Sequence, residues 1–285
     1  MEWVGSISEA IRYIEENLTE ELTVAQIAKH ALISPFYFQK GFSMLCGFTV
    51  GDYIRQRRLA LAGSELICTD AKVIDLALKY GYDSPDSFTK AFTRFHGITP
   101  TAARKCGATL KSFAPLNILF TLKGGFPMDY KIVKKDAFTV IAAAKKLPYD
   151  NAQIEVPKFW AEHYQSVKNQ TVCGMYGINI DEEMSGKEFE YLLADDYDGK
   201  SRVPEGFVTR TIPAFTWAVF PCIGAMPNAM PETNRKIFTE WLPGCKDYEF
   251  AAGYNVEMYS DPANYKNGVQ DERYYSEIWI PVKKK

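Results

Sequence analysis

This sequence of 285 residues contains a glutamate, Glu257, whose neighbours suit it to proton transfer or to ligand binding. Glu257 lies in "GYNVEMYSD", where the alternation of a β-strand puts Asn255, Glu257 and Tyr259 on one face. The apolar Val256 and Met258 take the other face. A carboxylate beside a tyrosine could do general acid–base work or help to bind a ligand.

Glu277 in "YSEIWIPV" is a second acidic candidate, because it shares a strand face with Tyr275 and Trp279. The alternative is that the two glutamates are edge charges and that the aromatic residues form an ordinary core. The same two interpretations, ligand site or ordinary core, apply to the other aromatic residues of this half of the chain: Tyr130, Trp160, Tyr164, Tyr176, Trp217, Trp241 and Tyr254.

Several kinds of site are not expected. His30, His96 and His163 lie far apart, and the six cysteines form no CxxC pair, so we expect no metal site and no cofactor. No Ser-His-Asp or Cys-His arrangement is visible. The sequence shows neither a signal peptide nor an apolar run of membrane-spanning length, which predicts a cytoplasmic protein.

A second group of candidate residues comes from a segment that the chain carries twice. Residues 34–50 read "SPFYFQKGFSMLCGFTV" and residues 84–100 read "SPDSFTKAFTRFHGITP". Both copies have Ser-Pro at the start, a Phe-x-Lys-x-Phe core and a later glycine, so Lys40 is equivalent to Lys90. Net charge around the copies is +6, from 12 basic and 6 acidic residues in 25–115, which suits a polyanionic partner.

Each copy is predicted to be a short helix, a tight turn and a second helix. In the first copy, Thr23 with Gln26 has the spacing of a capping box, and Ser34 caps the second helix with Pro35 at its first position. In the second copy, Gly81 supplies the turn before Ser84. Its first helix is expected to bury the stripe Val73, Ile74, Ala77 and Leu78. A long helix over residues 50–67 links the copies.

Two such hairpins are too few for a solenoid, which needs three or more units, and they fit helix-turn-helix DNA readers better. The segment "ALKYGYDSPDSFTKAFTRFHGITPTAAR" resembles the second-motif signature of the AraC/XylS-type transcription regulators, and the resemblance covers residues 4–107. It implies seven helices, with two recognition helices that enter successive major-groove segments of double-stranded DNA. The outward-facing residues expected to meet DNA are Phe36, Gln39, Lys40, Ser43, Asp86, Thr89, Lys90 and Thr93.

The side-chain types of these residues suit base reading. Glutamine can read adenine, lysine can read guanine or bind phosphate, and phenylalanine can pack on a thymine methyl group. Arg55, Arg57 and Arg58 on the linking helix are expected to touch phosphate or to brace the two units. Lysine in place of the arginine that many relatives carry at positions 40 and 90 should loosen guanine readout.

The second half of the chain is also duplicated. "KFWAEHY" at 158 matches "KIFTEWL" at 236, and "GMYGINI" at 174 matches "AGYNVEM" at 252, which puts Tyr176 on Tyr254 and Asn179 on Glu257. This pattern predicts two β-α-β-β units that share a sheet about a pseudo-twofold axis, with a cleft between them. The expected fold class is therefore multidomain, with an all-α double helix-turn-helix domain followed by an α+β domain.

Residues 127–284 resemble the GyrI-like effector-binding domain, through "TIPAFTWAVF", "VEMY" and "EIWIPV". The resemblance implies an aromatic pocket with a buried glutamate that binds drug-sized, often cationic molecules, and Glu257 matches that acid best. The ligand-binding candidates are Glu257, Trp217, Tyr176, Tyr254, Tyr259, Trp160 and Glu277.

These observations predict a ligand-responsive transcription regulator rather than an enzyme. Residues 1–107 would bind DNA, 108–127 would connect, and 128–285 would sense a small molecule. One alternative is a hydrolase in which Glu257 works with Tyr176 or Tyr254. Another is a DNA binder with a vestigial pocket that contacts RNA polymerase directly.

Overall fold

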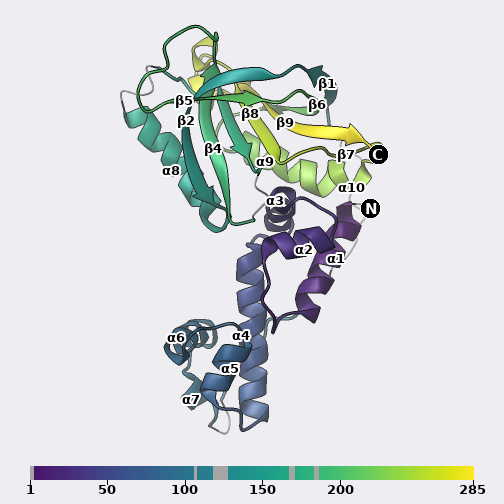
Figure 1. Ribbon diagram of the computed structural model, residues 1–285, viewed down its shortest axis with the longest axis vertical. Helices are drawn as coiled ribbons and strands as arrows, with labels where there is room; N and C mark the ends of the chain where they lie inside the picture. The colour runs from purple at the N-terminus through teal and green to yellow at the C-terminus, as the bar shows by residue number, and fades with distance from the viewer. Residues whose placement is uncertain (1–2, 106–107, 118–127, 167–170, 183–185) are drawn as a thin grey trace.

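The protein is described by a computed structural model that covers residues 3–105, 108–117, 128–166, 171–182 and 186–285. Helices of the N-terminal part form one body and a large sheet with its own helices forms the other, as Figure 1 shows. The connector expected at 108–127 lies partly outside the described residues. In the described part of the chain, no helix has the length and apolar character needed to cross a membrane.

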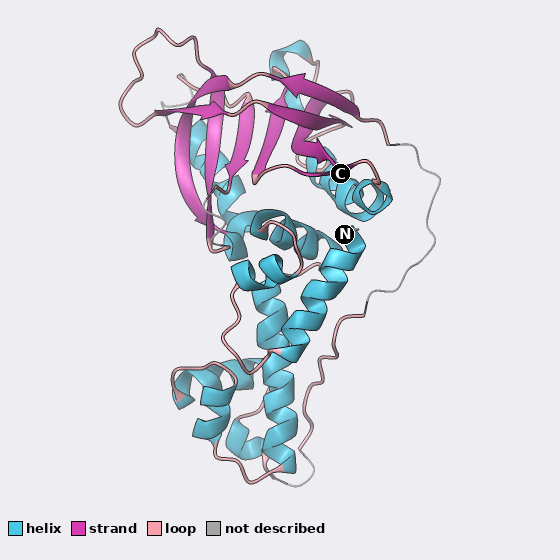
Figure 2. Ribbon diagram, turned by 45° about the vertical axis from the view of Figure 1, so that its right-hand side comes forward, coloured by secondary structure: helices cyan, strands magenta, loops and turns pink. Residues whose placement is uncertain are grey.

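The N-terminal part contains the seven helices that the AraC/XylS resemblance implies. The long helix α4 carries the first helix-turn-helix unit near its start and the second near its end (Figures 1 and 2). The helices are α1 (Trp3–Glu16), α2 (Val24–His30), α3 (Pro35–Cys46), α4 (Val50–Cys68), α5 (Val73–Lys79), α6 (Pro85–His96) and α7 (Pro100–Ala103).

The helix starts follow the capping residues that the sequence predicted. Thr23 and Gln26 form the reciprocal capping box, with Gln26 N donating to Thr23 Oγ1 at 3.2 Å and Thr23 N donating to Gln26 Oε1 at 2.9 Å. Ser34 and Ser84 each accept a backbone N–H at the start of α3 and α6, with proline at the first helical position. The duplicated segment is therefore a duplicated helix-turn-helix.

The buried stripe predicted for α5 is partly wrong. Leu76 and Ala77 are buried, but Ile74 and Leu78 are 47% and 62% exposed. This seven-residue helix packs in one cluster with Phe88 and Phe92 of α6 through a narrow stripe that includes Leu76 and Ala77. Ile74 and Leu78 fall outside that narrow stripe.

Gly81 offers a test of the turn in the second unit. Its φ is +79°, and a Cβ there would lie 2.5 Å from Nη1 of Arg58, which is held by hydrogen bonds to the carbonyls of Leu18 and Glu20. Gly47 has a similar φ of +76° and open space around it. Gly47→Ala should therefore cost about 1 kcal/mol of unfolding free energy from backbone strain alone. Gly81→Ala should cost about 1 kcal/mol more, measured by urea denaturation, because Arg58 must also move. Equal losses would contradict the role given to Arg58.

The described residues of the C-terminal part form a nine-stranded antiparallel sheet. Its order is β1-β6-β9-β8-β3-β4-β2-β5, with β7 added beside β9. The strands are β1 (Lys131–Lys135), β2 (Phe138–Pro148), β3 (Tyr176–Ile180), β4 (Glu188–Asp196), β5 (Val208–Ile212), β6 (Phe215–Ile223), β7 (Tyr248–Phe250), β8 (Tyr254–Tyr259) and β9 (Tyr275–Lys284). Helix α8 (Ala152–Gln165) belongs to the first unit, and α9 (Ala229–Lys236), η3 (Ile237–Trp241) and α10 (Leu242–Gly244) belong to the second.

The strand order has the internal symmetry that the duplication predicted. β3 and β8 lie at the centre, and Ile178 pairs with Val256, the same two residues that the alignment of the repeats matches. The pseudo-twofold axis therefore passes between them. The first strand of each unit joins the other unit's edge, since β1 pairs with β6 and β5 pairs with β2.

The sheet curls so that its two edges come together. Two residues, Asp136 and Ala137, connect β1 at one edge to β2 near the other edge. A trans chain advances about 3.5 Å per residue, so the ends of these strands lie within about 10 Å of each other. One face of the sheet is thus the inside of the curl and packs an aromatic core around Trp217 and Trp279. The other face carries the helices (Figures 1 and 2).

Candidate ligand site and nucleic-acid interface

Glu257 lies on the helix-bearing face of the sheet, within a cluster of hydroxyl and ring groups. The Tyr259 hydroxyl donates a hydrogen bond to Glu257 Oε2 at 3.0 Å. The Tyr191 hydroxyl interacts with the same carboxylate and accepts a hydrogen bond from Trp160 Nε1 at 2.9 Å. Trp160 stands edge-on to Tyr259 with ring centroids 5.3 Å apart. We call Glu257, Tyr191, Tyr259 and Trp160 the acidic cluster.

Gly177 makes room for this cluster on the neighbouring strand β3. It pairs with Glu257 across the β3–β8 ladder, so a side chain at 177 would point to the same face. A Cβ there would lie 2.4 Å from the Tyr191 hydroxyl and 3.3 Å from Glu257 Oε2. Any larger residue would displace the two groups from each other.

Burial raises the pKa of both tyrosines in the acidic cluster well above 10, and the negative charge of Glu257 adds to the effect. Both hydroxyls therefore keep their protons at neutral pH. They act as fixed donors that orient the Glu257 carboxylate.

The structure divides the residues predicted to bind a ligand between the two faces of the sheet. Glu257, Tyr259 and Trp160 come together in the acidic cluster. The ladder pairs and the alternation along each strand put Tyr176, Trp217, Tyr254 and Glu277 on the opposite face, inside the curl. The sequence placed these four residues at one site with Glu257, whereas the structure puts them on the other face of the sheet.

The suggested acid–base pairs are also separated by the sheet. Neither Tyr176 nor Tyr254 shares a face with Glu257. The tyrosines that do meet it are Tyr259 and Tyr191, and sequence reasoning missed Tyr191. A signal was present in "EFEYLLADD", because β4 pairs Tyr191 with Asn179 and alternation then puts it beside Glu257.

Glu277 is a satisfied structural charge inside the curl. It is 6% exposed, and its carboxylate accepts hydrogen bonds from Tyr275 at 2.6 Å, Trp279 Nε1 at 2.6 Å and Lys131 Nζ at 2.9 Å. Burial alone would raise the pKa of Glu277, but these three donors outweigh it and lower the pKa below its usual 4.5. The donors therefore account for its charge without a ligand.

Glu277→Gln should lower the unfolding free energy by about 1–3 kcal/mol at pH 7, because it removes a charged acceptor that three buried donors share. A carboxyl whose pKa is lowered by folding stabilises the protein above the unfolded pKa near 4.5. The difference between wild type and variant should stay constant from pH 8 to 5 and shrink as the pH falls below 4.5, measured by denaturant unfolding at each pH. A difference that grows in acid would contradict this description of Glu277.

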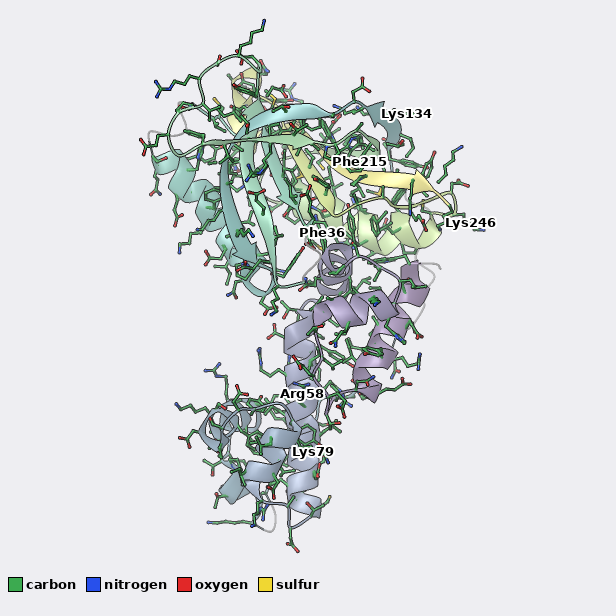
Figure 3. All side chains as sticks on the ribbon, viewed as in Figure 1. Phe36, Arg58, Lys79, Lys134, Phe215 and Lys246 are labelled. Carbon is green, nitrogen blue, oxygen red and sulfur yellow. The ribbon has the colours of Figure 1, made fainter. Side chains whose placement is uncertain are left out.

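The residues expected to read DNA from α3 do not face solvent in this structure. Phe36 is 3% and Gln39 is 7% exposed, and Lys40 and Ser43 are half-buried. The helix lies against the C-terminal part, where Figure 3 labels Phe36. The expectation that Phe36 and Gln39 face outward is therefore wrong for this conformation, because the C-terminal part covers the face that the helix-turn-helix core leaves free.

Aromatic contacts hold α3 in this position. The Tyr37 ring stacks on Phe250 of β7 with centroids 3.6 Å apart and planes inclined by 5°. The Tyr37 hydroxyl donates to the Tyr254 carbonyl at 2.6 Å. Phe36 meets Tyr149, with centroids 6.2 Å apart, and Tyr37 meets Phe238 of η3 at 6.4 Å. These contacts lie on the sheet face that carries Glu257.

Lys40 extends from α3 to β8. Its Nζ donates to Asn255 Oδ1 at 2.7 Å, and Asn255 lies two residues from Glu257 on the same face. Burial lowers the pKa of Lys40 to about 8, and the Glu257 carboxylate partly offsets this by attracting the ammonium group. Lys40 is thus a cation within the electrostatic reach of Glu257.

Helix α6 presents its candidate residues differently. Asp86 and Lys90 are exposed, while Thr89 and Thr93 are half-buried, with Thr93 Oγ1 donating to the Thr89 carbonyl at 2.7 Å. Arg55 is exposed and paired with Asp52. All five side chains keep solvent access, so the second recognition helix is open while the first is covered.

Of the other arginines on α4, two brace the fold. Arg57 pairs with Glu15 of α1 at 2.7 Å, and Arg58 donates to the carbonyls of Leu18 and Glu20. Both arginines therefore join α4 to α1 and to the segment that follows it, within the first helix-turn-helix unit.

An open groove of about 720 Å³ lies where the two parts of the chain meet. Trp3, Lys29 and Pro35 line it from the N-terminal side, and Phe250 and Lys283 line it from the C-terminal side. None of the acidic-cluster residues lines this groove. The groove therefore lies between the two parts of the chain, beside α3, and is separate from the site around Glu257.

Comparison with known proteins identifies both halves of the chain. The family model of the integron-associated effector binding proteins, Cass2, matches residues 131–282, and a helix-turn-helix domain model matches residues 27–105. The HTH-type transcriptional activator AarP of Providencia stuartii is 43% identical over 98 residues, which are 34% of this chain and 73% of AarP. The regulatory protein SoxS of Escherichia coli K12 is 38% identical over 98 residues, 34% of this chain and 92% of SoxS.

A solved structure of SAV2435 bound to tetraphenylphosphonium aligns with 55% of this chain and 94% of its own, at 21% identity and a TM-score of 0.48. The Cass2 match covers more than half of the chain, and AarP matches over more than two thirds of its own length. Both resemblances are thereby confirmed. The chain belongs to the integron-associated effector binding protein family and is a DNA-binding regulator of the AraC type with an effector-binding domain of the GyrI-like fold.

Proposed function

We propose that this regulator senses an aromatic or lipophilic cation at Glu257 and controls transcription by reading DNA through α3 and α6. The observation that carries the proposal is the half-buried Glu257 carboxylate, oriented by tyrosine hydroxyls that stay neutral at physiological pH. A partly buried carboxylate gains most from a partner that brings a full positive charge.

The groups around Glu257 suit such a ligand. The Tyr259 hydroxyl donates to the carboxylate and Trp160 stands edge-on to the Tyr259 ring, so a flat or lipophilic cation beside Glu257 would meet aromatic rings and negative charge together. The domain is of the effector-binding type, and this site joins both of its units, since Trp160 and Tyr191 come from the first and Glu257 from the second.

A binding role accounts for the acidic cluster better than catalysis does. General acid–base groups work best with pKa values near the working pH, whereas burial moves the tyrosine pKa values here away from neutrality. The relatives AarP and SoxS are described as an activator and a regulatory protein. We therefore propose that the domain binds its ligand without turnover.

On the DNA side, we propose that Phe36, Gln39, Lys40 and Ser43 of α3 and Asp86, Thr89, Lys90 and Thr93 of α6 meet the major groove, with Arg55 on phosphate. Base readout from α3 requires that the helix leave the position described above. We extend the proposal to a direct contact with RNA polymerase in the cytoplasm, in keeping with the activator among the relatives.

Isothermal titration calorimetry with two probes of the same shape tests the sensing proposal. Tetraphenylphosphonium is an aromatic monocation and tetraphenylborate is its anionic counterpart. The full chain should bind the cation with an affinity at least about tenfold higher, because only the cation is attracted by Glu257. Equal affinity for the two probes, or no binding of the cation, would overturn the proposal that this site senses cations.

A further inference from the structure

The helix that should read DNA packs on the face of the sheet that carries Glu257. We infer that the effector-binding domain is an intramolecular inhibitor of the first recognition helix, and that a cationic effector activates the protein by displacing α3 and its Lys40 from the sheet. The inference rests on the sensing role proposed for Glu257, and it adds how the site is regulated.

Helix α3 packs on the part of the sheet that lies next to the acidic cluster. The helix lies below the sheet between α8 on one side and η3 with α10 on the other (Figures 1 and 2). Phe36 and Tyr37 pack in one core with Phe238 and with Ile278 and Ile280 of β9. In the ladder Ile278 pairs directly with Glu257, so α3 and the acidic cluster use adjacent positions of one sheet face.

Lys40 carries the second step, because it offers the chemistry that the site would seek in an effector. Its ammonium group is bound by Asn255 at 2.7 Å and is attracted by Glu257. A lipophilic cation that pairs with Glu257 would repel the Lys40 ammonium and compete with the apolar surface of α3. Ligand and helix therefore cannot both occupy this part of the sheet face in the arrangement described.

The third step is that the docked helix cannot read DNA. A recognition helix contacts bases only when its outer face enters the major groove, which is about 12 Å wide. In the structure the effector-binding domain covers that face, and the side chains of Phe36 and Gln39 are almost without solvent contact. The exposed α6 remains free to bind DNA. The protein would then bind through one recognition helix in place of two, and so more weakly.

The docked state is also poised for release. Gln39 Nε2 is buried and has no hydrogen-bond partner among the described residues, a cost that would end on undocking. The lowered pKa of Lys40 shows that the docked helix bears a second cost in the charged ammonium group. The aromatic contacts of Tyr37 offset these costs, so a ligand of moderate affinity could shift the balance.

Phe250 allows a test that leaves the acidic cluster and the DNA-reading residues intact. It stacks on Tyr37 and meets Trp3 with ring centroids 5.9 Å apart, and it belongs to the edge strand β7. Phe250→Ala in the full chain should speed amide hydrogen exchange in 35–46 about 10- to 100-fold, since it removes the ring on which the docked helix rests. The affinity for tetraphenylphosphonium should rise by the same factor, because the competitor has been weakened.

Two further variants keep the result interpretable. Phe138→Ala removes a half-buried ring that packs inside the curl, on the opposite face of the sheet from Glu257 and α3, and it should change neither quantity. Tyr37→Phe removes only the hydroxyl that donates to the Tyr254 carbonyl, and it should speed exchange in 35–46 about 5-fold with the fold retained. If Phe250→Ala speeds exchange over the whole effector-binding domain, the substitution has destabilised the domain. The exchange of 35–46 in Tyr37→Phe then decides whether the docked helix is released.

The outcomes separate the two proposals. If wild type binds the cation but Phe250→Ala and Tyr37→Phe leave both its affinity and the exchange of 35–46 unchanged, the inhibitor inference is wrong and the sensing proposal stands. If no variant binds the cation, the sensing proposal fails, and with it the competition. Faster exchange of 35–46 together with tighter cation binding supports both.

Discussion

Glu257→Gln is expected to weaken tetraphenylphosphonium binding about 10- to 100-fold in isothermal titration calorimetry. The substitution keeps the size of the side chain and an acceptor for the Tyr259 hydroxyl, so it removes mainly the charge. A hydrogen-bonded charge in a partly buried site contributes about 1–3 kcal/mol, which corresponds to this range. Binding of tetraphenylborate should improve or stay the same in the variant.

Glu277→Gln is the matched control, because it removes a carboxylate from the opposite face of the same sheet. Its three donors hold Glu277 inside the curl, so the affinity for the cation should not change. A loss of affinity in Glu277→Gln equal to that in Glu257→Gln would place the ligand inside the curl instead. The description of the acidic cluster as the site would then be contradicted.

Lys40→Met is expected to tighten the docking of α3 by about 1–3 kcal/mol. The lysine pKa falls from 10.5 to about 8 on docking, so at neutral pH the docked helix carries an unfavourable charge. Methionine fills the same space without that charge, although Asn255 Oδ1 loses its donor. Amide exchange in 35–46 should slow about 10- to 100-fold. The affinity for DNA should fall, because the closed state is more populated and because the contact proposed for Lys40 is lost.

The repeat supplies the control for this experiment. Lys90 occupies the equivalent position on α6 and is exposed, and α6 lies at the end of the molecule away from the sheet (Figure 1). Lys90→Met should weaken DNA binding through a lost contact alone and leave the exchange of 35–46 as in wild type. Equal effects of the two substitutions on exchange would show that Lys40 has no part in docking.

Much of the fold could be predicted because it depends on local chemistry. The caps at Thr23, Ser34 and Ser84 and the turn at Gly81 each require a particular residue type at one position. The pseudo-twofold axis followed from the alignment of Ile178 with Val256, since an internal duplication leaves its trace in sequence spacing.

Features that depend on long-range geometry were not predictable in the same way. Alternation put Glu257 opposite Val256, but it gave no absolute direction for Trp217 or Tyr176 on other strands. That direction follows from the curl of the sheet, which results from the two-residue link at Asp136 and Ala137. For this reason the sequence could not tell that the predicted ligand-binding residues divide between the two faces of the sheet.

The docking of α3 was also beyond the sequence. Phe36 reads as an outer-face residue of a recognition helix, and an aromatic residue there suits a thymine methyl as well as a protein surface. The effector-binding domain provides that surface through Phe250 and Phe238. Helix propensity and capping hold equally in both states, so local signals cannot tell the docked helix from the released one.

By the inference drawn above, an effector and the first recognition helix compete for one face of the sheet. The most direct test is the affinity of the full chain for a fluorescent duplex, selected from a random pool by the wild-type protein, with and without saturating tetraphenylphosphonium. Fluorescence anisotropy should give a Kd at least about tenfold lower with the cation, no change with tetraphenylborate, and no change in Glu257→Gln. An unchanged or higher Kd, at a cation concentration that calorimetry shows to saturate the site, would contradict the account.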